Sequence, residues 1–184
     1  PALLLTSQQQ GARLLEDLGR LARLDDAIHG VPARVLPLAL WHTASVGLEM
    51  WLAAVAQGAS QVWVLMTEEE APQYQQAVQA QMEVAQAILS GLGYAGEHFR
   101  LLRARDARDL AALDASLRVA PAQGVAQAGG FHVQVDKRGT LELALSHLIS
   151  QAPSRPEQIA LPAAASPLGT IEVDKDACTL CLSC

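Results

Sequence analysis

Short apolar runs alternate along the chain with longer segments in which apolar residues recur every three or four positions. A near-continuous apolar run is typical of a strand buried on both faces of a parallel sheet, whereas a half-exposed strand alternates between apolar and polar residues. The pattern therefore predicts strands at Ala2–Thr6, Val35–Leu40, Val62–Met66, Phe99–Leu102 and Gln158–Leu161.

Helical patterns fill the intervals between these runs. From Gly11 to Leu24, for example, leucines form one stripe and most charged residues face away from it. The expected helices are Gly11–Leu24, Ser45–Gln57, a long helix that starts within Thr67–Pro72 and runs to Ser90, Asp106–Leu117 and Thr140–Ile149. This order predicts a right-handed, doubly wound α/β fold, with an open, mostly parallel sheet of about four or five strands and helices on both faces.

Several helix ends have recognisable signals. Ser45 is expected to cap the second helix at its start, and Gly58 is expected to end it in the left-handed conformation. Thr67 and Glu70 have the spacing of a capping box. The stretch Gly91–Gly96 matches G-x-G-x-x-G, but it follows a helical pattern and precedes an apolar run, so we interpret it as a helix end and turn rather than a dinucleotide site.

Composition and charge exclude several classes of protein. The chain has 184 residues, of which 51% are hydrophobic and 17% are charged, which is enough for one sizeable core. The net charge is -6 and the longest basic run is the pair Lys137-Arg138, so a nucleic-acid partner is not expected. No stretch approaches the roughly 20 apolar residues that cross a bilayer, and no secretion signal is recognisable, so we expect no membrane insertion of this segment.

All three cysteines, Cys178, Cys181 and Cys184, lie in the last seven residues at C-x2-C-x2-C spacing. Thiolates hold the iron of cubane clusters, and a two-residue gap lets successive cysteines reach different corners of one cluster. Such clustering indicates a metal or cluster site in a reducing compartment and predicts a cytoplasmic protein. A redox-inert tail, or a zinc site that lacks its fourth ligand, would also be consistent with the pattern.

The segment Gly169 to Cys184 resembles the start of a bacterial ferredoxin. Gly169–Asp174 alternates like one arm of a small hairpin and then turns into Cys178. In that family the run is C-x2-C-x2-C-x3-C-P. The resemblance implies that Cys178, Cys181 and Cys184 are ligands of one 4Fe-4S cluster. The fourth cysteine of the run, which holds the other cluster in that family, lies beyond the printed sequence. We therefore expect the cluster in a longer, full-length protein and none in these 184 residues alone.

A second resemblance covers residues 2 to 103. The runs that carry it are Arg34-Val-Leu-Pro-Leu-Ala-Leu40, Ala56-Gln57-Gly58-Ala59, Val62-Trp-Val-Leu65 and Ile88-Leu-Ser-Gly-Leu-Gly93. This part is similar to the delta subunit of methyl-viologen-reducing hydrogenase, which passes electrons between a hydrogenase and a flavin-containing partner. That family carries the cysteines of a two-iron cluster at its strand ends. Here those ends read Thr6-Ser7, Trp41-His42 and Met66-Thr67, so the resemblance implies the scaffold without the cofactor.

Four of the nine prolines fall between Ala152 and Leu168, which suits an extended connection. We therefore divide the chain into an α/β domain over residues 1–151, a Pro-rich linker and extended tail over residues 152–168, and the truncated start of a ferredoxin-like segment over residues 169–184.

Polar side chains follow two of the expected strands, where open α/β sheets usually bind ligands. His42, Thr43 and Ser45 follow the second strand, and Glu68, Glu69 and Glu70 follow the third. The three acids also suit the positive end of a helix dipole, which is a simpler explanation than a metal site. Likewise, capping is a simpler role for Ser45 than nucleophilic catalysis with His42.

The main hypothesis is a scaffold or docking domain of a multi-cluster iron–sulfur electron-transfer protein, an oxidoreductase component rather than an enzyme. Its partner would be a redox protein such as a dehydrogenase, a hydrogenase or a quinone-linked component. A small-molecule-binding α/β enzyme domain acting near His42, Thr43 and Glu68 is one alternative. A protein-interaction module that uses the exposed face of the long helix is the other.

Overall fold

The computed structural model describes residues 1–163, 165–169 and 174. Its strands β1 (Ala2–Ser7), β2 (Val35–Leu40), β3 (Gln61–Met66) and β4 (Phe99–Arg103) form one parallel sheet in the order β2-β1-β3-β4. The predicted open α/β fold is confirmed. The prediction of a fifth strand is wrong, because the described residues 158 to 161 form no strand and pack Ile159 and Leu161 against helices instead.

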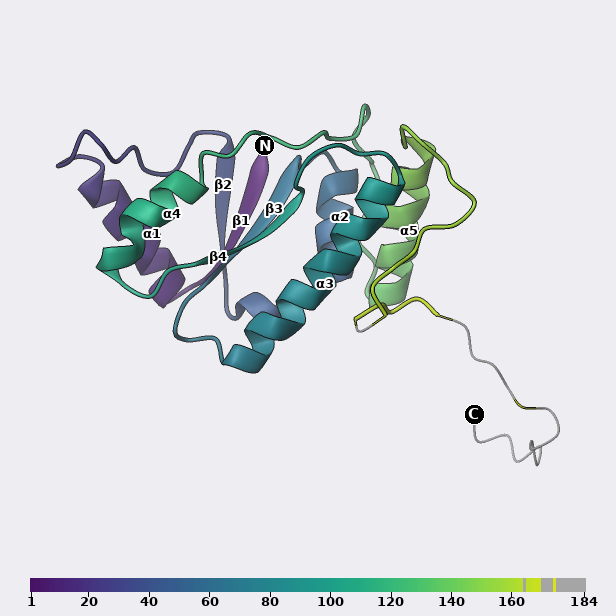
Figure 1. Ribbon diagram of the computed structural model, residues 1–184, viewed down its shortest axis with the longest axis horizontal. Coiled ribbons are helices and arrows are strands. Elements are labelled where there is room, and N and C mark those ends of the chain that lie inside the picture. Colours follow the sequence, from purple (N-terminus) through teal and green to yellow (C-terminus); the bar gives the residue numbers. More distant parts are fainter. Residues whose placement is uncertain (164, 170–173, 175–184) are drawn as a thin grey trace.

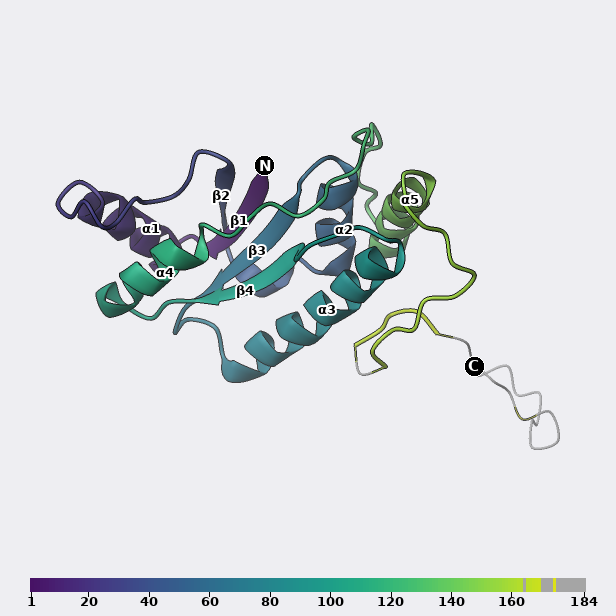
Figure 2. The same ribbon diagram turned by 45° about the horizontal axis from the view of Figure 1, so that its top comes forward.

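Five α-helices connect and flank the strands in the described chain. They are α1 (Gln10–Leu21), α2 (Leu48–Ala56), α3 (Pro72–Gly91), α4 (Leu110–Ser116) and α5 (Lys137–Ser150), with short 3-10 turns η1 (Thr43–Ser45) and η2 (Ala107–Asp109). Helices α1 and α4 cover one face of the sheet, and α2 and α3 cover the other (Figures 1 and 2). Helix α1 lies on a different face from α2 and α3 because the chain runs outward from β1 to β2 and then back across the sheet to β3 and β4. Each crossover stays right-handed.

Helix α5 adds an outer layer beyond α2 and α3 (Figures 1 and 2). Six of the nine residues of α2 are buried, because this helix packs against the sheet on one side and α5 on the other. Leu141, Ala144 and Leu148 of α5 belong to the same apolar core as Trp51 of α2. A second core lies on the opposite face and is built around Trp63, Leu14 and Leu18.

The carboxyl ends of α2 and α3 follow the sequence signals, but the start of α2 does not. Gly58, Gly93 and Gly96 all adopt positive φ, as expected of the turns after α2 and α3. The prediction that Ser45 caps α2 is wrong, since Gly47 holds the N-cap position. The amide of Leu48 donates instead to Oε1 of Gln81, at 3.3 Å, so a side chain from α3 satisfies the first turn of α2.

The edge strand β2 departs from the expected burial on both faces. Four of its six residues are exposed, and Leu36 and Leu38 retain 49% and 51% of their accessible surface. The carbonyls of Arg34 and Leu40 accept hydrogen bonds from the neighbouring β1 segment, so alternate residues face β1 and Pro37 faces outward. Proline has no N–H, and a sheet tolerates it at such an outward-facing edge position.

The Pro-rich segment that follows α5 packs back onto the helices. The amide of Ser154 donates to the carbonyl of Leu92 at 3.0 Å, and Ile159, Leu161 and Ala165 pack against the core. The contact with α3 is close at Gly91, where a Cβ would lie 2.6 Å from Cγ2 of Ile159. Within residues 152 to 163 and 165 to 169, these contacts attach the segment to the α/β domain at several points.

Candidate functional site at the carboxyl edge of the sheet

The carboxyl ends of the strands contain the crevice where doubly wound sheets bind ligands. In the order β2-β1-β3-β4, the chain leaves β1 toward one edge and returns to β3 on its other side, so the topological switch point lies between β1 and β3. The turn after β1 and the segment Thr67–Ala71 after β3 border this point.

Glu69 occupies the crevice at the start of α1. Its Oε2 accepts a hydrogen bond of 2.5 Å from the Ser7 hydroxyl, and both carboxylate oxygens lie 3.2 Å from the amide nitrogen of Gln10. Oγ of Ser7 in turn accepts from the amide of Gly11 at 2.9 Å. The amino end of a helix favours an anion, and here the chain supplies that anion itself.

Glu70 is buried beside this contact, with 3% of its surface exposed. Its Oε1 accepts from the Thr43 hydroxyl at 2.8 Å, and its Oε2 accepts from the amide and the hydroxyl of Thr67 at 2.8 and 3.0 Å. A buried carboxylate needs such donors to offset its desolvation. The pair Thr67 and Glu70 therefore bonds as the sequence suggested, but it forms a turn ahead of α3, which starts at Pro72 within the predicted interval.

His42 and Ser45 stabilise the turn after β2. Nδ1 of His42 accepts from the amide of Ala44 at 3.1 Å, and its ring packs edge-on against Tyr74 with centroids 5.3 Å apart. The Ser45 hydroxyl donates to the carbonyl oxygen of His42 at 2.6 Å. Ser45 thus bonds to the backbone of His42, and the geometry assigns both side chains to turn formation.

A pocket of about 480 Å³ lies beside the ends of β3 and β4. Thr67, Glu68 and Glu70 line one side, and Arg103 and Arg105 line the other. Arg105 is paired with Asp109 at 3.1 Å, whereas Arg103 has no hydrogen-bond or ion-pair partner among the described residues. The volume falls in the range of small-molecule sites.

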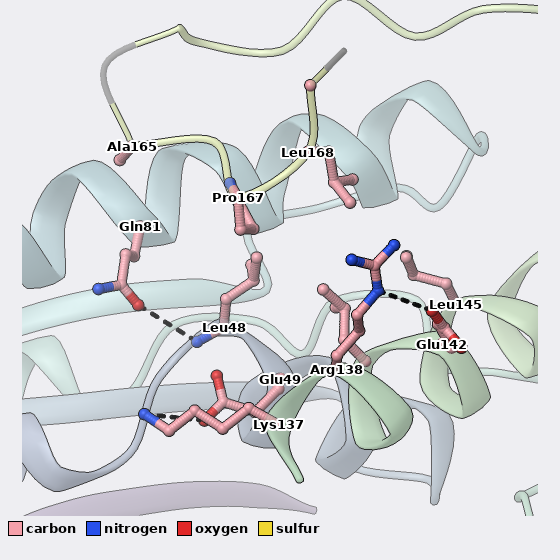
Figure 3. Close-up of a pocket in the computed structure, with 12 residues that line it drawn as sticks. Leu48, Glu49, Gln81, Lys137, Arg138, Glu142, Leu145, Ala165, Pro167 and Leu168 are labelled. Atoms are coloured by element: carbon pink, nitrogen blue, oxygen red, sulfur yellow. Dashed lines mark hydrogen bonds and ion pairs between the residues drawn. The ribbon is translucent and has the colours of Figure 1, made fainter. Parts of the chain in front are cut away.

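A second cavity, of about 460 Å³, lies between α2, α3, α5 and residues 165–169 (Figure 3). Pro167 and Leu168 are directed toward it from one side and Arg138 from the other (Figure 3). Arg138 is paired with Glu142 at 3.1 Å, and Nζ of Lys137 lies 3.7 Å from Oε1 of Glu49. The last continuous described residues before the cysteine run therefore lie against the outer helical layer.

The predicted cluster ligands Cys178, Cys181 and Cys184 lie outside the described residues, so their role stays a prediction. Within the described residues, no three His, Cys, Asp or Glu side chains are grouped as metal ligands, and no helix is long and apolar enough to cross a membrane.

The sequence analysis placed polar residues at the correct edge but missed their connections. It assigned Glu69 and Glu70 to the start of a helix, whereas they bind Ser7, the last residue of β1, and Thr43, which follows β2. The one local signal was the position of the acids directly after a strand, next to the switch point.

No family model matches this chain, and no curated protein matches it either. Function is therefore inferred from the chemistry of the residues themselves.

Proposed function

We propose that this α/β domain is the scaffold and docking domain of an iron–sulfur electron-transfer protein. Cys178, Cys181 and Cys184 would provide three ligands of a 4Fe-4S cluster, with a fourth from elsewhere in the full-length protein. Three thiolates at ferredoxin spacing suit the soft iron sites of such a cluster. When bound, the cluster would supply one-electron transfer, and a redox protein would be the partner.

The attachment of residues 152–163 and 165–169 is the observation that carries this proposal. The backbone of Ser154, the side chain of Ile159 and the residues at the second cavity hold this segment against the helices. Gly169 lines that cavity, and Cys178 follows it by nine residues, which span at most about 30 Å. The domain would therefore restrict where the cysteine segment can lie and would present it to a partner.

The carboxyl edge of the sheet is consistent with a scaffold. Glu69 holds the anion position at the start of α1, and the carboxylate of Glu70 is stabilised by hydrogen bonds from Thr43 and Thr67. These side chains tie the three strand ends together. In the family of hydrogenase delta subunits that the chain resembles, the strand ends carry thiolates, whereas Ser7 and Thr67 place hydroxyls there.

Metal analysis of the full-length gene product tests the proposal. Purified without oxygen, it should contain iron and sulfide in equal amounts, and the variant with Cys178→Ser, Cys181→Ser and Cys184→Ser should lose this cluster. Ser183→Ala, in the same segment, is the matched control and should keep it. Equal iron in the wild type and the triple variant, or a gene that encodes no further cysteine after Cys184, would contradict the proposal.

The pocket beside β3 and β4 favours a second candidate function, the binding of a small molecule. Arg103, which has no ion-pair partner among the described residues, offers its guanidinium to a ligand anion in this pocket, which Glu68 and Glu70 also line. A screen of small carboxylates and phosphates by thermal shift tests this candidate, and Arg103→Ala should remove any stabilisation. Shifts that are equal in the wild type and in Arg103→Ala would exclude this pocket as the site.

A further inference from the structure

The two edges of the sheet differ in their ability to pair with another strand. On β2, the outward-facing Pro37 lacks an N–H, and the outward amide of Val35 already donates to the carbonyl of Pro32 at 2.8 Å. Of the outward positions on this strand, Ala39 keeps its donor. The β2 edge is therefore a poor template for strand addition.

The β4 edge is open. The carbonyl of His98 accepts from Val62 at 2.8 Å, and the amide of Ala104 donates to Met66 at 3.1 Å, so the even-numbered residues of β4 face β3. By alternation, Phe99, Leu101 and Arg103 direct their N–H and C=O groups outward, where the described chain supplies no partner for them. Three donors and three acceptors in a row form a template for a further strand.

A groove along β4 leaves room for that strand. It has a volume of about 740 Å³ and runs between β4 and the side of α3 that carries Gln79, Met82 and Gln86. Leu101 and Arg103 also line it, and this is the same Arg103 that has no ion-pair partner among the described residues.

We propose that β4 pairs antiparallel with β4 of a second copy of this chain, about a two-fold axis at Leu101. In this register Leu101 lies opposite Leu101, and Phe99 lies opposite Arg103 of the second copy. Every outward N–H and C=O of the three residues then has a partner, as in the closely spaced pairs of an antiparallel ladder. In any other antiparallel register, at least one of Phe99, Leu101 and Arg103 does not lie opposite one of these three residues of the second copy.

The side chains favour the same register. Five residues, Phe99-Arg100-Leu101-Leu102-Arg103, place Arg103 opposite an aromatic ring and Arg100 opposite Leu102, so like charges do not face each other. The ring of Phe99 is buried in its own chain, so the guanidinium of Arg103 comes instead near the exposed carboxylate of Glu97 of the second copy, its diagonal neighbour across the ladder. A two-fold axis uses each of these contacts twice, which is how an isologous dimer forms from one patch.

The oligomeric state of the chain under reducing conditions tests this proposal. Light scattering over a dilution series should give twice the chain mass of 19.5 kDa at high concentration. Leu101→Pro removes an outward N–H from β4, as Pro37 does on β2, and should give a monomer. Leu101→Ala keeps this N–H and should still dimerise. Arg103→Glu leaves the ladder to β3 intact and should raise the dimer dissociation constant by about tenfold, because it removes both symmetric copies of the contact.

Two further measurements distinguish β4 from other surfaces. Amide exchange at Phe99, Leu101 and Arg103 should slow with rising protein concentration in the wild type, and in Arg103→Glu the same slowing should need about tenfold more protein. Pro37→Ala opens the second edge and should produce larger assemblies from dimers joined edge to edge. A wild-type chain that stays monomeric at all concentrations would overturn the proposal. So would a dimer whose dissociation constant is unchanged in Arg103→Glu and in a folded Leu101→Pro. An extended segment of another protein would then be the occupant to test.

Discussion

The hydroxyl of Thr43 lies 2.8 Å from Oε1 of Glu70 and donates a hydrogen bond to it. Thr43 follows β2 and Glu70 follows β3, and β1 lies between these strands in the sheet. The bond therefore spans the end of the central strand β1 and fixes the turns on its two sides relative to each other.

Loss of the Glu70 carboxylate should destabilise the fold. Glu70→Ala leaves the buried hydroxyl of Thr43 and the amide of Thr67 without their acceptor, and it should lower the free energy of unfolding by about 2 to 3 kcal/mol. Thr43→Val removes one donor and should cost about 1 kcal/mol. Urea denaturation measures both, with the exposed Glu68→Ala as control, which should stay within about 0.5 kcal/mol of the wild type. Equal effects of Glu68→Ala and Glu70→Ala would contradict the assignment.

Removal of the Glu69 carboxylate should create a binding position for a free anion. Glu69→Ala frees the Ser7 hydroxyl and the amide of Gln10 at the start of α1, and it should cost about 1 kcal/mol of stability. Added sulfate or phosphate should then raise the Tm of Glu69→Ala more than that of the wild type, because the ion replaces the carboxylate. Identical anion effects on the two proteins would show that Glu69 does not hold this position.

The buried Asp114 should make stability depend on acid pH. Its Oδ1 accepts from the amides of His29 and Gly30 at 3.1 and 2.8 Å, and its Oδ2 lies 3.2 Å from Nε of Arg118. Burial alone raises the pKa of this carboxyl, but the Arg118 guanidinium and the two amides outweigh it and hold the pKa below its ordinary value. The stabilisation is therefore present above the unfolded pKa of about 3.9 and is lost as pH falls through the lower folded pKa.

Asp114→Asn should accordingly lower stability at neutral pH and flatten its decline below about pH 4. Asp106→Asn is the matched exposed control. Hydrogen bonds from the Arg108 side chain and amide lower the pKa of Asp106 to about 2, but this pair is in water and salt screens it. High salt should therefore suppress the change in stability caused by Asp106→Asn, and it should not alter the change caused by Asp114→Asn. Equal salt sensitivity in the two variants would argue against a buried role for Asp114.

Local patterns predicted the regular elements well. The four strands begin and end within one residue of the predicted positions, because each is a mostly apolar run between turns. The prediction failed at residues 158 to 161, where Ile159 is apolar because it packs against Gly91, not because it pairs in a sheet. It failed again at Ser45, since the group that satisfies the start of α2 is Gln81, which lies 33 residues beyond Leu48 in sequence.

By itself, the sequence determined which segments are apolar, where helices end and which residues could bind iron, because periodicity, positive-φ glycines and cysteine spacing are local properties. The strand order was decided only by the tertiary structure, since pairing joins residues far apart in the chain. That order brings Ser7 to Glu69 and Thr43 to Glu70. The strand order also decides that β2 and β4 are edge strands. An apolar run cannot reveal this, because edge strands and central strands can have the same apolar pattern. The direction of a backbone N–H depends on which neighbour the strand has. For this reason Pro37 removes an outward donor from the β2 edge, whereas Leu101 keeps one at the β4 edge.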